Sequence, residues 1–267
     1  MANAGQPDEV DFVSGRTRIY GIVGDPIEQV RSPEMISAEF ASRGLDALLI
    51  PIHVLPADFD ACLAQLKRVQ NVDGLVFTIP YKRAAVALAD ELGAHARAIG
   101  AINALARRSQ GRWAGDIFDG MGCVEAFRRR GIALAGKRVM LVGAGGAGSA
   151  IAAAVAAEQP ASLCIFDVDP ARASALARKV GATHVAAASV DDVDVLLNAT
   201  PVGMLDDARV PIAVDTLPAT LVVFDAIVKP ERTPLLALAE ACGCTTVRGR
   251  EMMRGQIAKM VDFFYPP

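Results

Sequence analysis

Aromatic residues, cysteine and histidine are all scarce in this sequence of 267 residues. Aromatic side chains make up 5% of the chain and the formal net charge is −3, so the chain offers neither the rings nor the basic surface that nucleic acids require. The five cysteines form no CxxC pair and no zinc-binding spacing, and the three histidines are scattered. The sequence therefore predicts no nucleic-acid partner, no metal site and a reducing compartment.

Long apolar runs are also missing. No stretch of ~18 uninterrupted apolar residues occurs, which predicts no membrane contact. Residues 1–16 include acidic residues, proline and glycine but no apolar segment of the kind that signal peptides contain, and we expect them to form a flexible tail. Together these features predict a cytoplasmic protein.

Hydrophobic residues are abundant, at 52% of the chain, and they fall into short, regularly spaced segments. From residue 18, segments rich in Val, Ile and Leu alternate with amphipathic segments of helical period, which is typical of βαβ units around a largely parallel sheet. The expected strands are 18–24, 47–54 and 74–80, and the expected helices are 32–44, 57–69 and 82–93. Two strands around a turn at 109–111 and a helix over 119–131 follow.

A second βαβ series begins at residue 137, and its strands are apolar on both faces, as a sheet covered by helices requires. We therefore predict an α/β protein of two domains. The first, a substrate and catalytic domain, comprises residues 17–119 and 248–267. The second, residues 120–247, is a Rossmann-type, doubly wound dinucleotide-binding domain.

The end of the chain carries an apolar stripe at helical spacing, which needs a surface to pack on. Its members are Met252, Met253, Ile257, Met260, Val261 and Phe264. We expect this C-terminal helix to return to the first domain, with a cleft between the two domains.

A glycine-rich segment follows the first strand of the second series. Gly143, Gly145 and Gly148 have GxGxxG spacing between that strand and an Ala-rich helix, which is the context that dinucleotide binding requires. Free amides at the helix start would face the pyrophosphate. The predicted cofactor loop is Gly143, Ala144, Gly145, Gly146, Ala147 and Gly148.

Asp167 ends the next strand, nineteen residues after Gly148. A carboxylate there can accept hydrogen bonds from the ribose hydroxyls and repels a 2′-phosphate, so the sequence favours NAD over NADP. The alternative is that Asp167 only caps the helix that starts near Pro170, although Asp169 is better placed to do so.

Eight short segments, in order along nearly the whole chain, resemble the shikimate/quinate 5-dehydrogenase family. They are GIVGDPIEQVRSP, GLVFTIPYK, GAINAL, GDIFDGMG, GAGGAG, NATPVGM, TPLL and GREMMRGQ. The resemblance implies a first domain that binds a hydroaromatic acid, a second that binds the nicotinamide cofactor, and chemistry in the cleft between them. The oligomeric state is not implied.

The resemblance also implies roles for particular residues. The catalytic pair would be Lys82 and Asp119, since oxidising a secondary alcohol releases a proton to a base and the reverse reaction needs an acid. The implied substrate contacts are Ser32, Thr78, Asn103 and Gln256, and the implied nicotinamide contacts are Asn198, Thr200, Val202 and Met204. Ser32 could instead cap the helix that Pro33 opens, and Asn198 and Thr200 could be local turn formers.

Apolar residues stand at five positions where the family usually has polar ones. They are Val30, Val76, Ile117, Phe118 and Val228. We expect these changes to cluster in the substrate and nicotinamide region. They favour a less hydroxylated ring, or a related acid with one apolar face, because unpaired polar groups are costly to bury. The alternatives are a genuine shikimate dehydrogenase of aromatic amino-acid biosynthesis and a non-catalytic dinucleotide-binding sensor.

Overall fold

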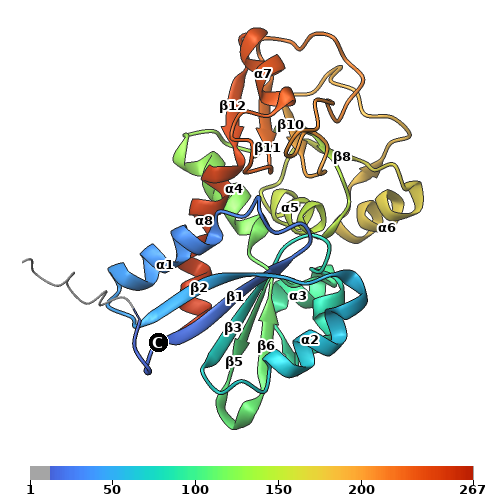
Figure 1. Ribbon diagram of the computed structural model, residues 1–267. Helices are drawn as coiled ribbons and strands as arrows, with labels where there is room; N and C mark the ends of the chain where they lie inside the picture. Colours follow the sequence, from blue (N-terminus) through green and yellow to red (C-terminus); the bar gives the residue numbers. More distant parts are fainter. Residues whose placement is uncertain (1–12, 267) are drawn as a thin grey trace, which may run out of the picture.

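The computed structural model describes residues 13–266 and shows two α/β domains, with helix α8 (Gly249–Phe264) running between them (Figure 1). Of the predicted tail, residues 13–16 are exposed and residues 1–12 lie outside the described part of the chain. The predicted two-domain α/β fold is confirmed, whereas the exact boundaries at 119/120 and 247/248 stay a prediction. No helix among the described residues is long and apolar enough to span a membrane.

The first domain is built on a six-stranded sheet of order β2-β1-β3-β5-β6-β4. Its strands are β1 (Arg18–Gly24), β2 (Ala47–His53), β3 (Val72–Phe77), β4 (Glu91–Leu92), β5 (Ala104–Arg107) and β6 (Trp113–Asp116). Its helices are α1 (Ser32–Ser42), α2 (Phe59–Leu66) and α3 (Ala94–Ile99). Strands β1, β2 and β3 pair in parallel, but β5 runs antiparallel to β3 and β6, so this sheet is mixed rather than largely parallel.

The helix expected over 82–93 does not form. The chain makes a 3-10 turn, η2 (Ala84–Leu88), and then pairs with β6 through β4. Asp90 fixes this path, because its Oδ2 accepts a hydrogen bond of 2.8 Å from the backbone N–H of Trp113. Pairing with a distant strand thus overrides the local helical pattern.

The second domain has a fully parallel sheet of order β12-β11-β10-β7-β8-β9. Its strands are β7 (Arg138–Val142), β8 (Ser162–Phe166), β9 (Thr183–His184), β10 (Val195–Asn198), β11 (Val222–Asp225) and β12 (Thr245–Arg248). The chain order reverses between β7 and β10, which is the switch point where doubly wound sheets bind their ligands.

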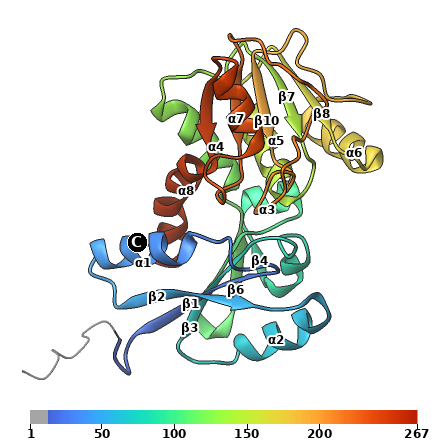
Figure 2. The ribbon, with the colours of Figure 1, turned by 45° about the horizontal axis from the view of Figure 1, so that its top comes forward.

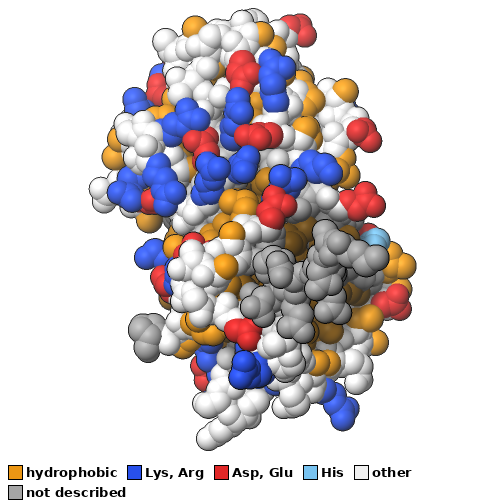
Figure 3. Space-filling model, turned by 60° about the vertical axis from the view of Figure 1, so that its left-hand side comes forward, with side chains coloured by type: hydrophobic (Ala, Val, Ile, Leu, Met, Phe, Trp, Pro, Cys, Tyr) orange, Lys and Arg blue, Asp and Glu red, His pale blue; other side chains and the backbone are white. Residues whose placement is uncertain are grey.

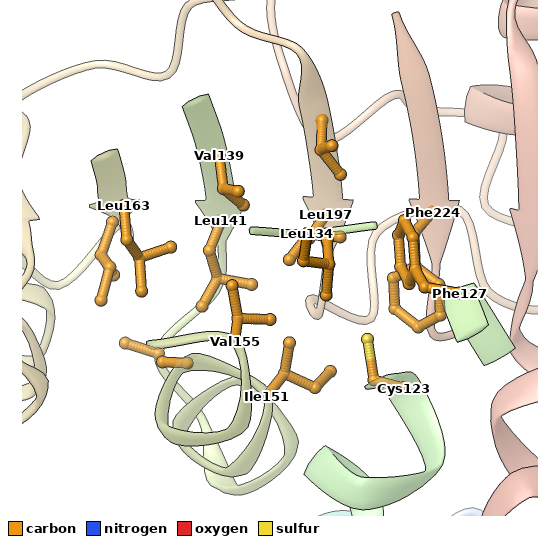
Figure 4. Packing of buried hydrophobic residues seen from close by; sticks show 14 of the residues in the cluster. Cys123, Phe127, Leu134, Val139, Leu141, Ile151, Val155, Leu163, Leu197 and Phe224 are labelled. Atoms are coloured by element: carbon orange, nitrogen blue, oxygen red, sulfur yellow. The ribbon is translucent and has the colours of Figure 1, made fainter. Parts of the chain in front are cut away.

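Helices cover both faces of this second sheet. They are α4 (Asp119–Arg129), α5 (Gly146–Ala157), α6 (Pro170–Val180) and α7 (Pro234–Ala241). Figure 4 shows Ile151 and Val155 of α5, and Cys123 and Phe127 of α4, facing Leu197 and the other core residues of the strands. The opposite face packs on α7 through buried Leu235 and Leu236.

Helix α8 returns to the first domain, as its apolar stripe predicts. Ile257, Met260, Val261 and Phe264 join the cluster that contains Tyr20 and Phe40, whereas Met252 packs in the core of the second domain. Figure 2 shows α8 beside α1 on its way between the two sheets. One helix therefore spans both cores and limits how far the domains can separate.

Charged side chains of both signs share the surface. On the face drawn in Figure 3, Lys and Arg are interspersed with Asp and Glu over the second domain. Elsewhere among the described residues charged side chains also pair, for example Arg130 with Glu251 at 2.7 Å and Arg232 with Glu240 at 2.7 Å. This face therefore presents mixed charge rather than a basic field.

Candidate active site

A cavity of about 180 Å³ lies where the two domains meet. All six residues predicted to be catalytic or to bind substrate line it, namely Ser32, Thr78, Lys82, Asn103, Asp119 and Gln256. They come from five separate elements or loops, so only the fold brings them together. Ala147, Thr200 and Met204 of the predicted cofactor segments line the other side.

Lys82 and Asp119 form an ion pair inside this cavity. Lys82 Nζ donates to Asp119 Oδ2 at 2.5 Å, and the two side chains are 15% and 3% exposed. Lys82 lies in the loop after β3, and its carbonyl accepts from the N–H of Ile102 at 2.8 Å. Asp119 is the first residue of α4. The pair therefore sits on two well-fixed backbone segments, largely shielded from water.

Asn103 links the backbone beside Asp119 to the side chain of Gln256 on the substrate side of the cavity. Its Oδ1 accepts from the N–H of Phe118 at 3.0 Å, next to Asp119, and its Nδ2 donates to Gln256 Oε1 at 3.3 Å. Asn103 and Gln256 are both buried, so their amides present fixed polar groups to a ligand. Ser32 is buried in the first turn of α1, and the N-cap of that helix is Arg31 rather than Ser32.

The expected clustering of the five apolar replacements holds for three of them. Val30, Val76 and Val228 line the cavity. Ile117 and Phe118 do not, and that part of the expectation is wrong. Ile117 packs with Ile99 and Ala150, whereas Phe118 joins the core of the first domain, because this segment turns only Asp119 toward the cavity.

The glycine-rich loop has the shape that a dinucleotide needs. Gly143 follows β7 with φ +106°, a conformation that favours glycine, and a Cβ on Gly148 would overlap the carbonyl of Gly143. A Cβ on Gly145 would meet nothing within 4 Å, so the space in front of the loop stays open. Gly145 also caps α5, whose free amides face that space.

Asp167 is buried beside this loop and does not cap a helix. Its Oδ2 accepts from the N–H of Ala144 at 2.7 Å, and its Oδ1 accepts from the N–H of Asp169 at 2.9 Å. The cap of α6 is Asp169, which accepts from the N–H of Arg172. Asp167 therefore ties the end of β8 to the loop, and each oxygen keeps a lone pair for a ribose hydroxyl.

Asn198 and Thr200 shape the predicted nicotinamide side from within the protein. Asn198 is fully buried, and its Oδ1 accepts from the N–H and the hydroxyl of Thr200 at 3.0 and 2.7 Å. The Thr200 hydroxyl in turn accepts from the N–H of Val202 at 3.2 Å. The turn-forming alternative thus describes Asn198 well, while Thr200 and Met204 reach the cavity.

Asp225, which the sequence interpretation missed, anchors this turn. Its Oδ1 accepts from Asn198 Nδ2 at 3.1 Å and from the N–H of Ile227 at 3.0 Å, and its Oδ2 accepts from the Thr233 hydroxyl at 2.7 Å. Burial raises the pKa of Asp225 to about 6, against these hydrogen bonds. The signal available in the sequence was its place: Asp225, like Asp167, is an acidic residue at the end of an expected strand.

Asp225→Asn is expected to remove a pH dependence of stability. Because the pKa of Asp225 is about 6 in the fold and lower in the unfolded chain, its stabilising contribution is present below about pH 4 and is lost as the pH rises through 6. At ~1.4 kcal/mol per pKa unit, the unfolding free energy of the wild type relative to the variant should fall by about 2 kcal/mol between about pH 4.5 and 7.

Urea unfolding of both proteins across this range measures the effect. The slope against pH is the test, since the substitution also changes hydrogen bonds at every pH. Asp206→Asn, at an exposed position, is the matched control and should leave the slope unchanged. Parallel pH curves for the wild type and Asp225→Asn would contradict the assignment.

Two family models match the chain. Residues 22–105 match the shikimate dehydrogenase substrate binding domain, and residues 125–204 match shikimate/quinate 5-dehydrogenase. A curated relative, the shikimate dehydrogenase (NADP(+)) of Thermococcus kodakarensis, is 35% identical over 248 residues, which is 91% of this chain and 89% of that protein.

Solved structures share the fold over almost the whole chain. Quinate dehydrogenase from Corynebacterium glutamicum in complex with NAD is 28% identical, with a TM-score of 0.81 and coverage of 93% of each chain. The 5-ketofructose reductase of Gluconobacter sp. strain CHM43 is 29% identical, with a TM-score of 0.79 and coverage of 95% of each chain.

Proposed function

The chain belongs to the shikimate/quinate 5-dehydrogenase family, and on this premise we propose that it transfers a hydride between NAD(H) and a secondary alcohol or ketone of a hydroaromatic acid. It is an oxidoreductase of CH–OH groups that uses a nicotinamide dinucleotide. The observation that best supports the proposed substrate is one shared cavity beside the glycine-rich loop. It holds the Lys82–Asp119 pair, Ser32 and the amides of Asn103 and Gln256.

Lys82 is proposed to move the proton. In oxidation its Nζ accepts the hydroxyl proton of the substrate, and in reduction it donates a proton to the carbonyl oxygen. Asp119 keeps Nζ in position through the hydrogen bond at 2.5 Å. The bound nicotinamide would accept or supply the hydride. The substrate ring would be oriented by Gln256, Asn103, Thr78 and Ser32, so that its reacting carbon faces the dinucleotide.

We place the dinucleotide on residues 143–148, with Asp167 at the adenosine ribose and Thr200, Val202 and Met204 at the nicotinamide. The open space before Gly145 and the amides of α5 support this placement. The first test is a screen of alicyclic hydroxy acids with NAD and with NADP, followed by the absorbance of the reduced cofactor. No turnover with any hydroaromatic acid would overturn the proposal.

NAD is expected to be used far better than NADP. Asp167 carries a negative charge where a 2′-phosphate would lie, and it is already fixed by the N–H of Ala144. This preference is a proposal, since the curated relatives bear names with NADP(+) while the quinate dehydrogenase structure holds NAD. The measurement is kcat/KM with each cofactor for the wild type and Asp167→Ser.

Asp167→Ser should narrow the difference between the cofactors, because the repulsion is removed while a short polar side chain remains. Asp169→Ser is the matched control, since that residue caps α6 and should leave the cofactor ratio unchanged. Equal or better kcat/KM with NADP in the wild type would show that the pocket admits the phosphate despite Asp167.

A second candidate is the reduction of a polyhydroxy ketone that lacks a carboxylate. It is favoured by Val30, which leaves Ser32 as the hydroxyl side chain of this segment, and by the likeness to 5-ketofructose reductase. Neutral keto sugars belong in the same screen. Turnover of these compounds and of no hydroxy acid would select this candidate.

A further inference from the structure

Arg83 follows Lys82 in the chain and reaches across to the second domain. Its Nη2 donates to the carbonyl oxygen of Ala144 and to the hydroxyl of Ser149, both at 3.1 Å. Ala144 belongs to the glycine-rich loop, and Ser149 is a buried residue of α5. The substrate domain is therefore bonded directly to the segment proposed to hold the pyrophosphate.

Ala144 is held from both sides. Its N–H donates to Asp167 Oδ2 at 2.7 Å, and its carbonyl accepts from Arg83. Asp167, which is proposed to bind the adenosine ribose, and Arg83, which follows Lys82, therefore both bind Ala144. A shift of the loop at Asp167 would thus also displace the bond to Arg83.

Close packing accompanies these hydrogen bonds. A Cβ on Gly146 would lie 2.9 Å from Lys82 Cβ, so the glycine is what lets Lys82 approach the loop. The two residues Lys82 and Arg83 consequently lie against the loop together, Lys82 by contact and Arg83 by hydrogen bonds. Moving the loop away would release both.

Arg83 has a positive charge that could attract an anion bound at the loop. Within residues 13–266 its side-chain hydrogen bonds go to Ala144 and Ser149, and none of the described carboxylates pairs with it. A guanidinium has five N–H donors, so donors remain beyond the two bonds of Nη2. A pyrophosphate on the α5 amides would lie near this positive charge.

From these contacts we infer that Arg83 is a positioning residue that clamps the substrate domain onto the dinucleotide loop and so couples dinucleotide binding to the alignment of Lys82. The inference rests on the proposed dinucleotide site. It goes beyond the proposed function in making the affinity for the cofactor depend on a residue of the other domain.

The test compares Arg83→Met, Arg83→Lys and Ser149→Ala with the wild type. Isothermal titration with NADH gives the dissociation constant without any substrate, and steady-state rates at saturating NADH give kcat. Arg83→Met should weaken NADH binding roughly fivefold to tenfold and lower kcat by a similar factor, the scale of losing hydrogen bonds to a charged group at a partly exposed site.

Arg83→Lys separates charge from geometry. It keeps the positive charge, but its shorter side chain does not carry a nitrogen to the place of Nη2, so it should restore most of the NADH affinity and little of kcat. Ser149→Ala removes one acceptor of Arg83 and also the bond from the Ser149 hydroxyl to the Ala144 carbonyl at 3.4 Å. Its effect should be smaller than that of Arg83→Met, and smaller again in the Arg83→Met background, because the two changes share one bond. Arg68→Met, at an exposed arginine after α2, is the matched control.

Unchanged NADH affinity and kcat in Arg83→Met would overturn the inference, as would additive effects of Arg83→Met and Ser149→Ala. The failure of the proposed function looks different. In that case the wild type turns over no hydroxy acid, while the titrations with NADH still report whether Arg83 contributes to dinucleotide binding. Should Arg83→Met not fold, Arg83→Lys and Ser149→Ala carry the same comparison.

Discussion

Lys82→Ala is expected to lower kcat by roughly 10²-fold or more on whichever substrate the screen identifies, the usual scale for losing a positioned acid or base. The alanine that replaces it cannot accept or donate a proton. Asp119→Asn should have an effect of the same order, because the amide leaves Lys82 without the carboxylate that holds it at 2.5 Å.

A measurement of dinucleotide binding distinguishes a variant that has lost catalysis from one that has lost its fold. Lys82→Ala removes an ion pair that is largely buried, but the apolar cores of both domains stay intact. The dissociation constant of NADH should therefore change little in either variant. Lys259→Ala, at an exposed position of α8, is the matched control. Near wild-type kcat in Lys82→Ala would assign the proton transfer to another group.

The elements that the sequence predicts well are those governed by local pattern. The segment 18–24 is predicted as a strand and is β1 (Arg18–Gly24), and the stripe from Ile257 to Phe264 packs where a returning helix must pack. The glycine-rich motif begins directly after β7 and runs into the first turn of α5, because its spacing encodes a backbone turn rather than a distant contact. Such features need no knowledge of the tertiary neighbours.

The features that the sequence does not predict depend on partners far along the chain. Strand β4 exists because β6 offers it a partner, and the antiparallel direction of β5 is set by the same sheet. Ile117 looks like a pocket residue next to Asp119, but the direction of its side chain is decided by packing on Ile99 and Ala150. Periodicity cannot supply this information.

The same limit applies to the site. The resemblance to the family singles out Lys82 and Asp119, yet nothing near Arg83 in the sequence indicates that its guanidinium meets Ala144 and Ser149, more than sixty residues away. Asp225 is similar, since its role depends on Asn198 and Thr233. Polar residues that act through other residues are found only once the contacts are known.

Shikimate is expected to be a poor substrate, or none. Val30, Val76 and Val228 line the cavity where the family usually has polar side chains, so two or three hydrogen bonds to a shikimate-like ring should be missing. Each buried polar group left without a partner costs about 1–3 kcal/mol, and ~1.4 kcal/mol is a factor of ten. The expected loss in kcat/KM for shikimate is therefore on the order of 10²-fold or larger.

Restoring polarity should reverse part of this loss. Val30→Ser and Val76→Asn together should raise kcat/KM for shikimate more than either change alone, because both side chains border one small cavity and would share the pose of one ring. The matched control is the double variant Val30→Ala and Val76→Ala. It enlarges the cavity without adding a hydrogen-bonding group, and so it tests volume against polarity.

The measurement is kcat/KM with NAD for shikimate, quinate and less hydroxylated cyclohexane carboxylates, in the wild type and in both double variants. The less hydroxylated acids should be preferred by the wild type, because their rings leave fewer groups unpaired against valine. A wild-type value for shikimate of ~10⁴ M⁻¹s⁻¹ or above would lie in the ordinary range of enzymes acting on their own substrates. Thr78, Asn103 and Gln256 would then suffice to bind the hydroxylated ring, and biosynthetic shikimate dehydrogenase would be the better assignment.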